Sequence, residues 1–186
     1  MTTATSVLRK EHDAILRMLD ITEEVTRRLD RGERVTPETL LELLEFFRVF
    51  ADRCHHGKEE DLFFPLLEKK GLPKFGGPTG VMRAEHEQGR ALIKQMAEAA
   101  QAYQDRTAGA AARWGEAARS YTALLRTHID KENNVLFKMA EHLLTGTEQQ
   151  ELANAFDRAE EEKIGHGTHK RLHALMEKLA ADVFAH

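Results

Sequence analysis

Apolar residues recur along the chain at intervals of three and four positions, the spacing that places side chains on one face of an α-helix. The first such segment covers about residues 6–29 and has Leu8, Ile15, Leu16 and Leu19 on its apolar face. Similar segments follow with little sequence between them. The pattern therefore predicts an all-α fold.

Capping and turn residues mark the second helix and the loop that follows it. Thr36 can cap this helix, Pro37 suits its first turn, and Pro65 is expected to kink its last turns. Residues 71–80 contain four of the twelve glycines and two of the four prolines. This composition predicts a loop.

Two more long helices are predicted, over about residues 81–103 and 117–144. Residues 105–116 form either a connection or the frayed start of the later helix. Four long helices joined by short connections favour an up-down-up-down four-helix bundle.

The C-terminal part adds further helices. Thr147 and Gln150 have the spacing of a capping box at the start of one helix. Gly165 and Gly167 are expected to interrupt that helix before a last one that ends near Phe184. These pieces are expected to pack against the bundle.

The composition agrees with one helical domain. The chain has 186 residues, of which 41% are apolar and 31% are charged, and roughly 150 residues per domain is usual. We expect a single domain over residues 1–186, with the bundle at about 6–145 and a helical extension at about 147–186.

Charge and hydropathy limit the expected partners. The net charge of −4 is small, and the sequence has no long run of residues with the same charge, so nucleic acid is not expected as a partner. No segment approaches the ~20 apolar residues of a membrane span, and the N-terminus lacks the pattern of a signal peptide. The cytoplasm is the expected location. The single Cys54 excludes a disulfide framework within the chain and a cysteine-rich metal site.

Each long helix places a histidine on its apolar face. His12 shares a face with Leu8 on the first helix, and His86 shares a face with Met82 on the third. The same spacing argument applies to the second and fourth helices, where a carboxylate accompanies the histidine.

On the fourth helix, His128 and Glu132 share one stripe with Leu125, Val135 and Leu136. No lysine or arginine lies on that stripe within one turn. A buried carboxylate needs an ion pair, hydrogen bonds or a metal ion. The stripe therefore raises the question of what Glu132 binds.

The second helix offers two adjacent histidines, which an internal match separates. The stretches "HHGKEEDLFF" and "HIDKENNVLF" align without a gap, so His55 corresponds to His128 and Glu59 corresponds to Glu132. The phase of an α-helix also places His55 and Glu59 between its apolar stripes. We therefore choose His55 and Glu59 as the inward pair.

The residues next to this pair have simpler expected roles. His56, Glu60 and Asp61 are expected on a solvated face. Cys54 is expected to be a buried structural thiol, with a peroxide-responsive thiol as the alternative. Arg90, one turn after His86, is expected to pair with an acid near the site or on the surface.

A lone histidine on an apolar face is more often a hydrogen-bonded core residue than a ligand. One inward histidine per helix, with a carboxylate one turn after two of them, instead indicates a metal site formed by His12, His55, Glu59, His86, His128 and Glu132. Imidazoles and carboxylates without thiolates suit iron, manganese or zinc. Two bridging carboxylates and a bridging water or oxide would leave about two of roughly twelve octahedral positions open, which favours iron.

The ordered set of motifs resembles the hemerythrin-like, or HHE cation-binding, family. The resemblance spans residues 8 to about 144, and the Glu-x-x-His motif of ferritin-like sites is absent from the chain. The matching motifs are "EH" at His12, "HHGKEEDLFFP" at His55 and Glu59, "EHEQGR" at His86, and "HIDKENNVLF" at His128 and Glu132.

The resemblance implies a four-helix bundle around a non-haem di-iron centre with carboxylate and oxo or hydroxo bridges. The family uses such centres for O2 binding or sensing, iron handling, and oxidative or nitrosative stress functions. Its oxygen carriers have a second histidine one turn after the third-helix ligand, where this chain has Arg90. They also have an aspartate five residues after the fourth-helix ligand, where this chain has Glu132 at four. The missing imidazole argues against simple O2 carriage.

Histidines near the C-terminus offer a replacement for that imidazole. His166, His169 and His173 are spaced three and four apart, and Glu162 shares a helical face with the last two. His169 is the candidate. The alternative is that it lies at an interface or supports a ligand by a hydrogen bond.

Three functions remain open at this point. The first is a di-iron protein that binds O2, NO or peroxide at an open iron site, as a sensor, a scavenger or in iron handling. The second is a di-iron enzyme that decomposes peroxide or oxidises ferrous iron. The third is a helical interaction module whose histidines hold zinc or no metal. A redox partner and the oligomeric state are not indicated by the sequence.

Overall fold

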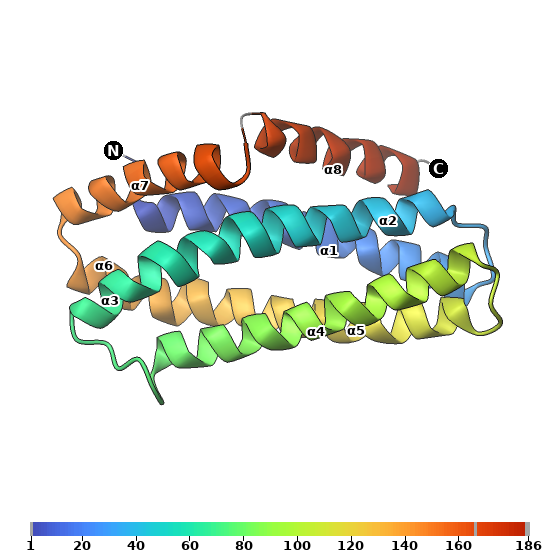
Figure 1. Ribbon diagram of the computed structural model, residues 1–186, viewed down its shortest axis with the longest axis horizontal. Helices are drawn as coiled ribbons and strands as arrows, with labels where there is room; N and C mark the ends of the chain where they lie inside the picture. The colour runs from blue at the N-terminus through green and yellow to red at the C-terminus, as the bar shows by residue number, and fades with distance from the viewer. Residues whose placement is uncertain (1, 166, 185–186) are drawn as a thin grey trace.

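Four long helical segments lie side by side and alternate in direction along the chain (Figure 1). The first is α1, Ala4–Asp30, and the third is α4, Pro78–Gln104. The computed structural model describes residues 2–165 and 167–184, and within these ranges it contains helices and no strands. The predicted all-α bundle with additional C-terminal helices is confirmed.

The second and fourth segments each consist of consecutive helical pieces. The second contains α2 (Pro37–Phe46), η1 (Phe47–His56), η2 (Glu59–Phe63) and α3 (Phe64–Lys69). The fourth contains α5 (Ala110–Lys131), η3 (Glu132–Leu136) and α6 (Phe137–Leu143). The η pieces are π-helical, so their hydrogen bonds span five residues and each turn holds more than 3.6 residues. Such segments occur frequently at functional sites.

The two π-helical pieces after the inward histidines begin at the two glutamates. Glu59 begins η2 and Glu132 begins η3, and each five-residue piece gives way to an α-helix at Phe64 or Phe137. Pro65 lies two residues after the end of η2, in the first turn of α3. The two stretches that match in sequence therefore also match in backbone structure.

The start of the second segment agrees with its sequence signals. The Thr36 side chain accepts a hydrogen bond from the backbone N–H of Thr39, and Pro37 occupies the first turn of α2. The missing N–H of a proline costs nothing at this position, because the first helical N–H groups have no partner within the helix. The predicted cap is confirmed.

Helix α7, Gly146–Lys163, begins earlier than expected. Thr145 accepts a hydrogen bond from the backbone of Glu148, and the Glu148 side chain accepts one from the backbone N–H of Thr145. The capping box predicted at Thr147 and Gln150 is therefore wrong. Glutamate favours the Thr145 pair because its charged carboxylate stabilises the positive end of the helix.

The last two helices cover one side of the bundle. Helix α7 lies along α1, and α8, Thr168–Phe184, lies along α1 and α2 (Figure 1). In the connection between α7 and α8, Gly165 and Gly167 have φ angles of 90° and 83°, a backbone conformation that glycine adopts without strain. Helix α8 buries Leu172, Met176, Leu179 and Val183.

The core consists of two apolar clusters with a polar layer between them. The larger cluster includes Ile15, Phe50 and Ile93, and the smaller one includes Leu8, Phe63, Met82 and Leu136. On each long segment the inward histidine lies between residues of the two clusters along the chain. The polar residues are thus shielded from water by apolar side chains at both ends.

One predicted inward residue lies outside the core. Val135 is 52% exposed, although an α-helical phase places it on the stripe of His128. It lies within η3, whose wider turn rotates it away from that stripe. None of the described helices is long and apolar enough to cross a membrane.

Candidate metal centre

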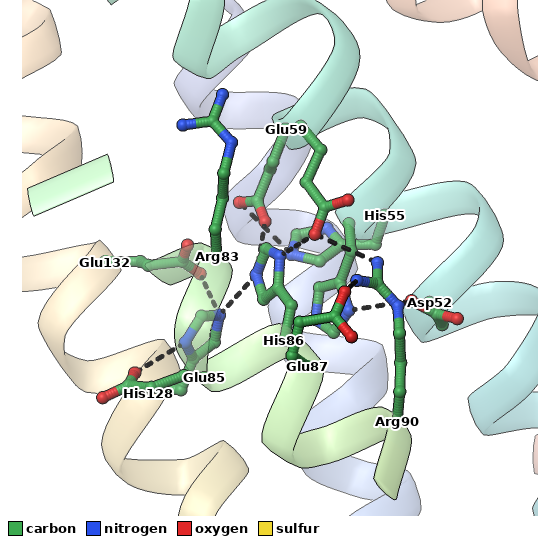
Figure 2. Close-up of polar contacts among 12 residues, drawn as sticks. Asp52, His55, Glu59, Arg83, Glu85, His86, Glu87, Arg90, His128 and Glu132 are labelled. Carbon is green, nitrogen blue, oxygen red and sulfur yellow. Dashed lines mark hydrogen bonds and ion pairs between the residues drawn. The ribbon is translucent and has the colours of Figure 1, made fainter. Parts of the chain in front are cut away.

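Six buried side chains from all four long segments converge between the apolar clusters. Each of them is at most 1% exposed. Figure 2 shows several of these side chains turned toward one another. They are the six residues selected from the sequence, namely His12, His55, Glu59, His86, His128 and Glu132.

The six side chains form two overlapping groups, in each of which one ligand atom per residue lies within 4.8 Å of the others. Glu59 and Glu132 belong to both groups. One group is completed by His12 and His55, and the other by His86 and His128. This arrangement has the form of two metal positions that share a pair of carboxylates.

Each of the four imidazoles is oriented by a hydrogen bond at Nδ1, so that Nε2 is directed to the centre. The acceptors are side-chain oxygens of neighbouring residues. The four pairs are His12 with Asn133, His55 with Glu11 and His128 with Glu85, all at 2.9 Å, and His86 with Glu60 at 2.6 Å.

The orientation of His86 and His128 brings two lone pairs together. Glu60 and Glu85 are carboxylates and accept hydrogen bonds only, so Nδ1 donates in both pairs, and in the neutral form of each imidazole Nε2 then carries a lone pair. The two Nε2 atoms lie 3.1 Å apart (Figure 2). Two facing lone pairs repel each other, and a cation between them converts the repulsion into ligation.

The inward nitrogen and oxygen atoms of the other four residues also face the centre as potential metal ligands. Nε2 of His12, Nε2 of His55 and all four carboxylate oxygens of Glu59 and Glu132 are buried, and within the described residues none of them makes a hydrogen bond of good geometry. Their contacts are within the set of six inward residues, and Nε2 of His12 lies 3.1 Å from Oε2 of Glu132. Burying a polar group without a hydrogen bond costs on the order of a few kcal/mol of folding free energy. The donor set therefore fits one or more bound metal ions.

Burial controls the charge of these groups. It lowers the pKa of His55 to about 3 and that of His86 to about 2, which keeps both imidazoles neutral and ready to bind a metal. Burial, together with the charge of Glu132, raises the pKa of Glu59 well above its ordinary value. Burial also opposes ionisation of Glu132, but His128 and His12 outweigh it and hold that pKa well below the ordinary value.

The expectation that His56 lies on a solvated face is wrong. His56 is only 4% exposed, and its ring stacks on that of His86 with centroids 3.9 Å apart and an interplanar angle of 14°. It ends the π-helical η1, in which consecutive residues are rotated by less than in an α-helix. The wider turn therefore brings both His55 and His56 inward.

Glu60 also differs from the expectation, whereas Asp61 is exposed as predicted. Glu60 is partly buried and accepts hydrogen bonds from His86 and, at 3.0 Å, from Arg90. Arg90 also donates to Asp52 at 2.8 Å (Figure 2). The predicted pairing of Arg90 with an acid near the site is confirmed.

Sequence reasoning missed the residues that orient the imidazoles. Glu11 and Glu85 each precede an inward histidine in an "EH" pair, but each binds the histidine of another helix, His55 or His128. The signal was the repeated "EH" at equivalent places on the first and third helices. Its meaning depends on helix packing, which the sequence alone did not specify.

A buried lysine connects the acidic residues that orient the imidazoles to the C-terminal part of the chain. Lys58 is 3% exposed and donates to Glu11 and, at 2.5 Å, to Glu160 of α7. Cys54 is buried beside Glu160, with its Sγ 3.5 Å from the carboxylate. Burial raises the pKa of the Cys54 thiol to about 12, which favours the structural role over a reactive thiolate.

His169 lies near the residues that surround the six inward side chains. Its ligand atom groups with those of Glu11 and Glu160, and its ring packs on Phe50 with centroids 4.9 Å apart. It does not join the groups formed by the six inward residues. His173 packs on His169, the Glu162 side chain is exposed, and His166 lies outside the described residues. These positions favour the supporting role for His169.

A cavity of about 310 Å³ reaches the centre from the surface. His56 and His86 form part of its lining, together with Gly89, Ile93 and Tyr121. Arg48, Arg90 and Lys94 also line it. The cavity therefore provides a route for a small molecule to the side of the centre that carries His86.

Comparisons with known proteins agree with this geometry. The sequence model of the Hemerythrin HHE cation binding domain matches residues 3–140. The chain is 28% identical over 163 residues to uncharacterized proteins of Mycobacterium bovis and Mycobacterium tuberculosis. The match covers 88% of this chain and 63% of each relative, so the chain spans less than two thirds of their length. No solved structure matches the chain with significant similarity.

Proposed function

Because the chain belongs to the hemerythrin HHE cation-binding family, we propose that it holds two iron ions at the buried centre. One ion would be held by His12 and His55, the other by His86 and His128. The membership of Glu59 and Glu132 in both groups is the observation that carries the proposal, because shared carboxylates are what a two-metal centre requires.

The donor chemistry supports a first-row metal and favours iron among them. Four imidazoles and two carboxylates contain no thiolate, which fits iron, with manganese and zinc as alternatives. A structural zinc site is typically closed with four ligands. Two ions that share six side chains retain open positions, and such positions suit a metal that binds and reduces small molecules.

We propose O2, NO or peroxide as the ligand. Bound iron would supply redox chemistry and an open coordination position for such a molecule. The cavity beside His86 has a volume of about 310 Å³, which is room for such a molecule, and the two apolar clusters shield the centre at both ends. The surrounding residues hold the imidazoles in one orientation and keep their nitrogen lone pairs directed inward.

The proposed role is that of a sensor, a scavenger or an iron-handling protein in a stress response. The enzyme alternative, peroxide decomposition or oxidation of ferrous iron, would use the same centre. Optical titration separates the two. A stable adduct formed in proportion to the protein supports binding, whereas sustained O2 evolution from peroxide or continued Fe(II) turnover supports the enzyme.

Metal analysis of protein purified without added metal tests the proposal. We expect about two iron ions per chain, as for carboxylate-bridged pairs in helical bundles, and a loss of iron in His128→Ala. His142→Ala is the matched control, because His142 lies on the same long segment with an exposed side chain. Zinc in place of iron, or an iron-free protein whose stability is unchanged by His128→Ala, would support the interaction module instead.

A further inference from the structure

The inward turn of His56 leaves a buried imidazole unsatisfied. Both ring nitrogens are buried, and neither has a hydrogen-bond partner in the described part of the chain. The nearest acid is Asp52, whose Oδ1 lies 3.5 Å from Nδ1, a distance too long for a hydrogen bond of useful strength. A polar ring in this state is costly unless a ligand binds it.

The surroundings of His56 contain the groups with which it could share a ligand. A nitrogen of His56, one of His86 and one of His128 all lie within 4.8 Å of one another. The ring centroids of His56 and His128 are 5.7 Å apart, at 76° to each other. The Nε2 atoms of His86 and His128 already lie 3.1 Å apart.

We propose that His56 supplies a fifth imidazole nitrogen, to the ion held by His86 and His128. The inference rests on the proposed function, because it requires that an ion binds there. Asp52 lies on the Nδ1 side of His56, which leaves Nε2 for the metal. Binding requires the ring to tilt out of its stack on His86, and rotation about the Cβ–Cγ bond of histidine is soft.

The fifth nitrogen makes the two metal positions unequal. The position at His86 and His128 then has three imidazoles, whereas the one at His12 and His55 has two. Because both share the same two glutamates, the first position is closer to coordinative saturation. The chain therefore distinguishes its two ions by the donors that the π-helical η1 provides.

Chemical rescue tests this inference. His56→Gly leaves an imidazole-sized gap that opens on the cavity, so small rings added to the solution can enter it. We expect this variant to bind its second iron at least about tenfold more weakly than the wild type. Added imidazole should restore the affinity and the optical spectrum. Pyrrole, a ring of the same size whose nitrogen lone pair is part of the aromatic system and cannot bind a metal, should restore neither.

A second variant removes doubt about folding. His56→Phe keeps a ring stacked on His86 but has no nitrogen, and we expect it to fold and to bind the second iron as weakly as His56→Gly. Unchanged iron affinity in His56→Phe, or rescue of His56→Gly by pyrrole as well as by imidazole, or by neither ring, would show that His56 only packs. The wild type's iron content tests the proposed function separately, because it does not depend on either variant.

Discussion

The Nδ1 atom of His55 lies 2.9 Å from Oε2 of Glu11, whose other carboxylate oxygen accepts a hydrogen bond from the buried Lys58. Burial opposes ionisation of Glu11, but His55 and Lys58 outweigh it and lower its pKa to about 2. The charged carboxylate fixes the orientation of the imidazole. It also links α7 to the centre, because Lys58 contacts Glu160.

Removing this carboxylate should weaken metal binding without removing a ligand. We expect Glu11→Gln to lower the affinity for iron by about 10- to 100-fold, the usual effect of losing the group behind a metal-bound histidine. Competition with a chelator measures the change. Asp13→Asn, an exposed site on the same helix, is the control. Equal affinities for Glu11→Gln and Asp13→Asn would show that the contact does not tune the centre.

The centre should also show a conflict between stability and metal binding. Burial raises the pKa of Glu59, so its negative charge destabilises the metal-free fold at neutral pH. We expect Glu59→Gln to raise the melting temperature of the metal-free protein, by about 2–4 °C for each kcal/mol gained, and to abolish iron binding. Calorimetry of chelator-treated protein measures the first effect, with the exposed Glu151→Gln as control. A lower melting temperature than wild type would contradict this account.

The metal-free protein should lose stability in mild acid. Burial lowers the pKa of His55 and His56 to about 3 and that of His86 to about 2. In the unfolded chain these groups take up protons near pH 6.5. Below pH 6.5 the unfolded state therefore binds more protons, and the free energy of unfolding falls by up to about 1.4 kcal/mol per pH unit for each imidazole.

Two other groups, Glu59 and His128, have raised pKa values and affect the pH dependence differently. Glu59 has a raised pKa, so the folded state takes its proton first and gains stability as pH falls toward 4.5. Burial opposes the charge of His128, but Glu132 and Glu85 raise its pKa, so its contribution is complete below pH 6.5 and is lost only above it. The net slope is still a loss on acidification. Urea unfolding between pH 7 and 4.5 measures it, and a flat profile would contradict the burial of neutral imidazoles.

The cavity should control access to the iron. A Cβ added at Gly89 meets Tyr121 at an ordinary 3.6 Å, so Gly89→Ala is tolerated, whereas Gly89→Leu fills the passage toward His86. We expect Gly89→Leu to slow the binding of NO or azide at least about tenfold, which corresponds to about 1.4 kcal/mol in the barrier, with unchanged iron content. Stopped-flow spectroscopy compares the two variants. Equal rates would indicate another route.

The sequence predicted the six converging residues because four histidines and two glutamates occupy helical faces in a regular way. It failed where the backbone departs from the α-helix. A period of 3.6 residues per turn placed His56 outside and Val135 inside. The π-helical η1 and η3 rotate His56 inward and Val135 outward. Nothing in the hydrophobic pattern reports a local change of helix type.

Two further features were not predicted correctly or at all. The sequence alone does not indicate that Glu11 binds the histidine of the second helix. The cap at Thr145 was visible in "TGTE", but the neighbouring Thr147 offered a similar spacing. Packing between helices decides the partner of Glu11, and the charge of Glu148 at the start of α7 decides the cap.

Anomalous X-ray diffraction from iron-loaded crystals, recorded above and below the iron absorption edge, tests the central claim most directly. The account predicts two anomalous peaks inside the bundle, one beside His12 and His55 and one beside His86 and His128, with Glu59 and Glu132 contacting both. A single peak, a peak at Glu11, Glu160 and His169, or no peak in this layer would contradict it.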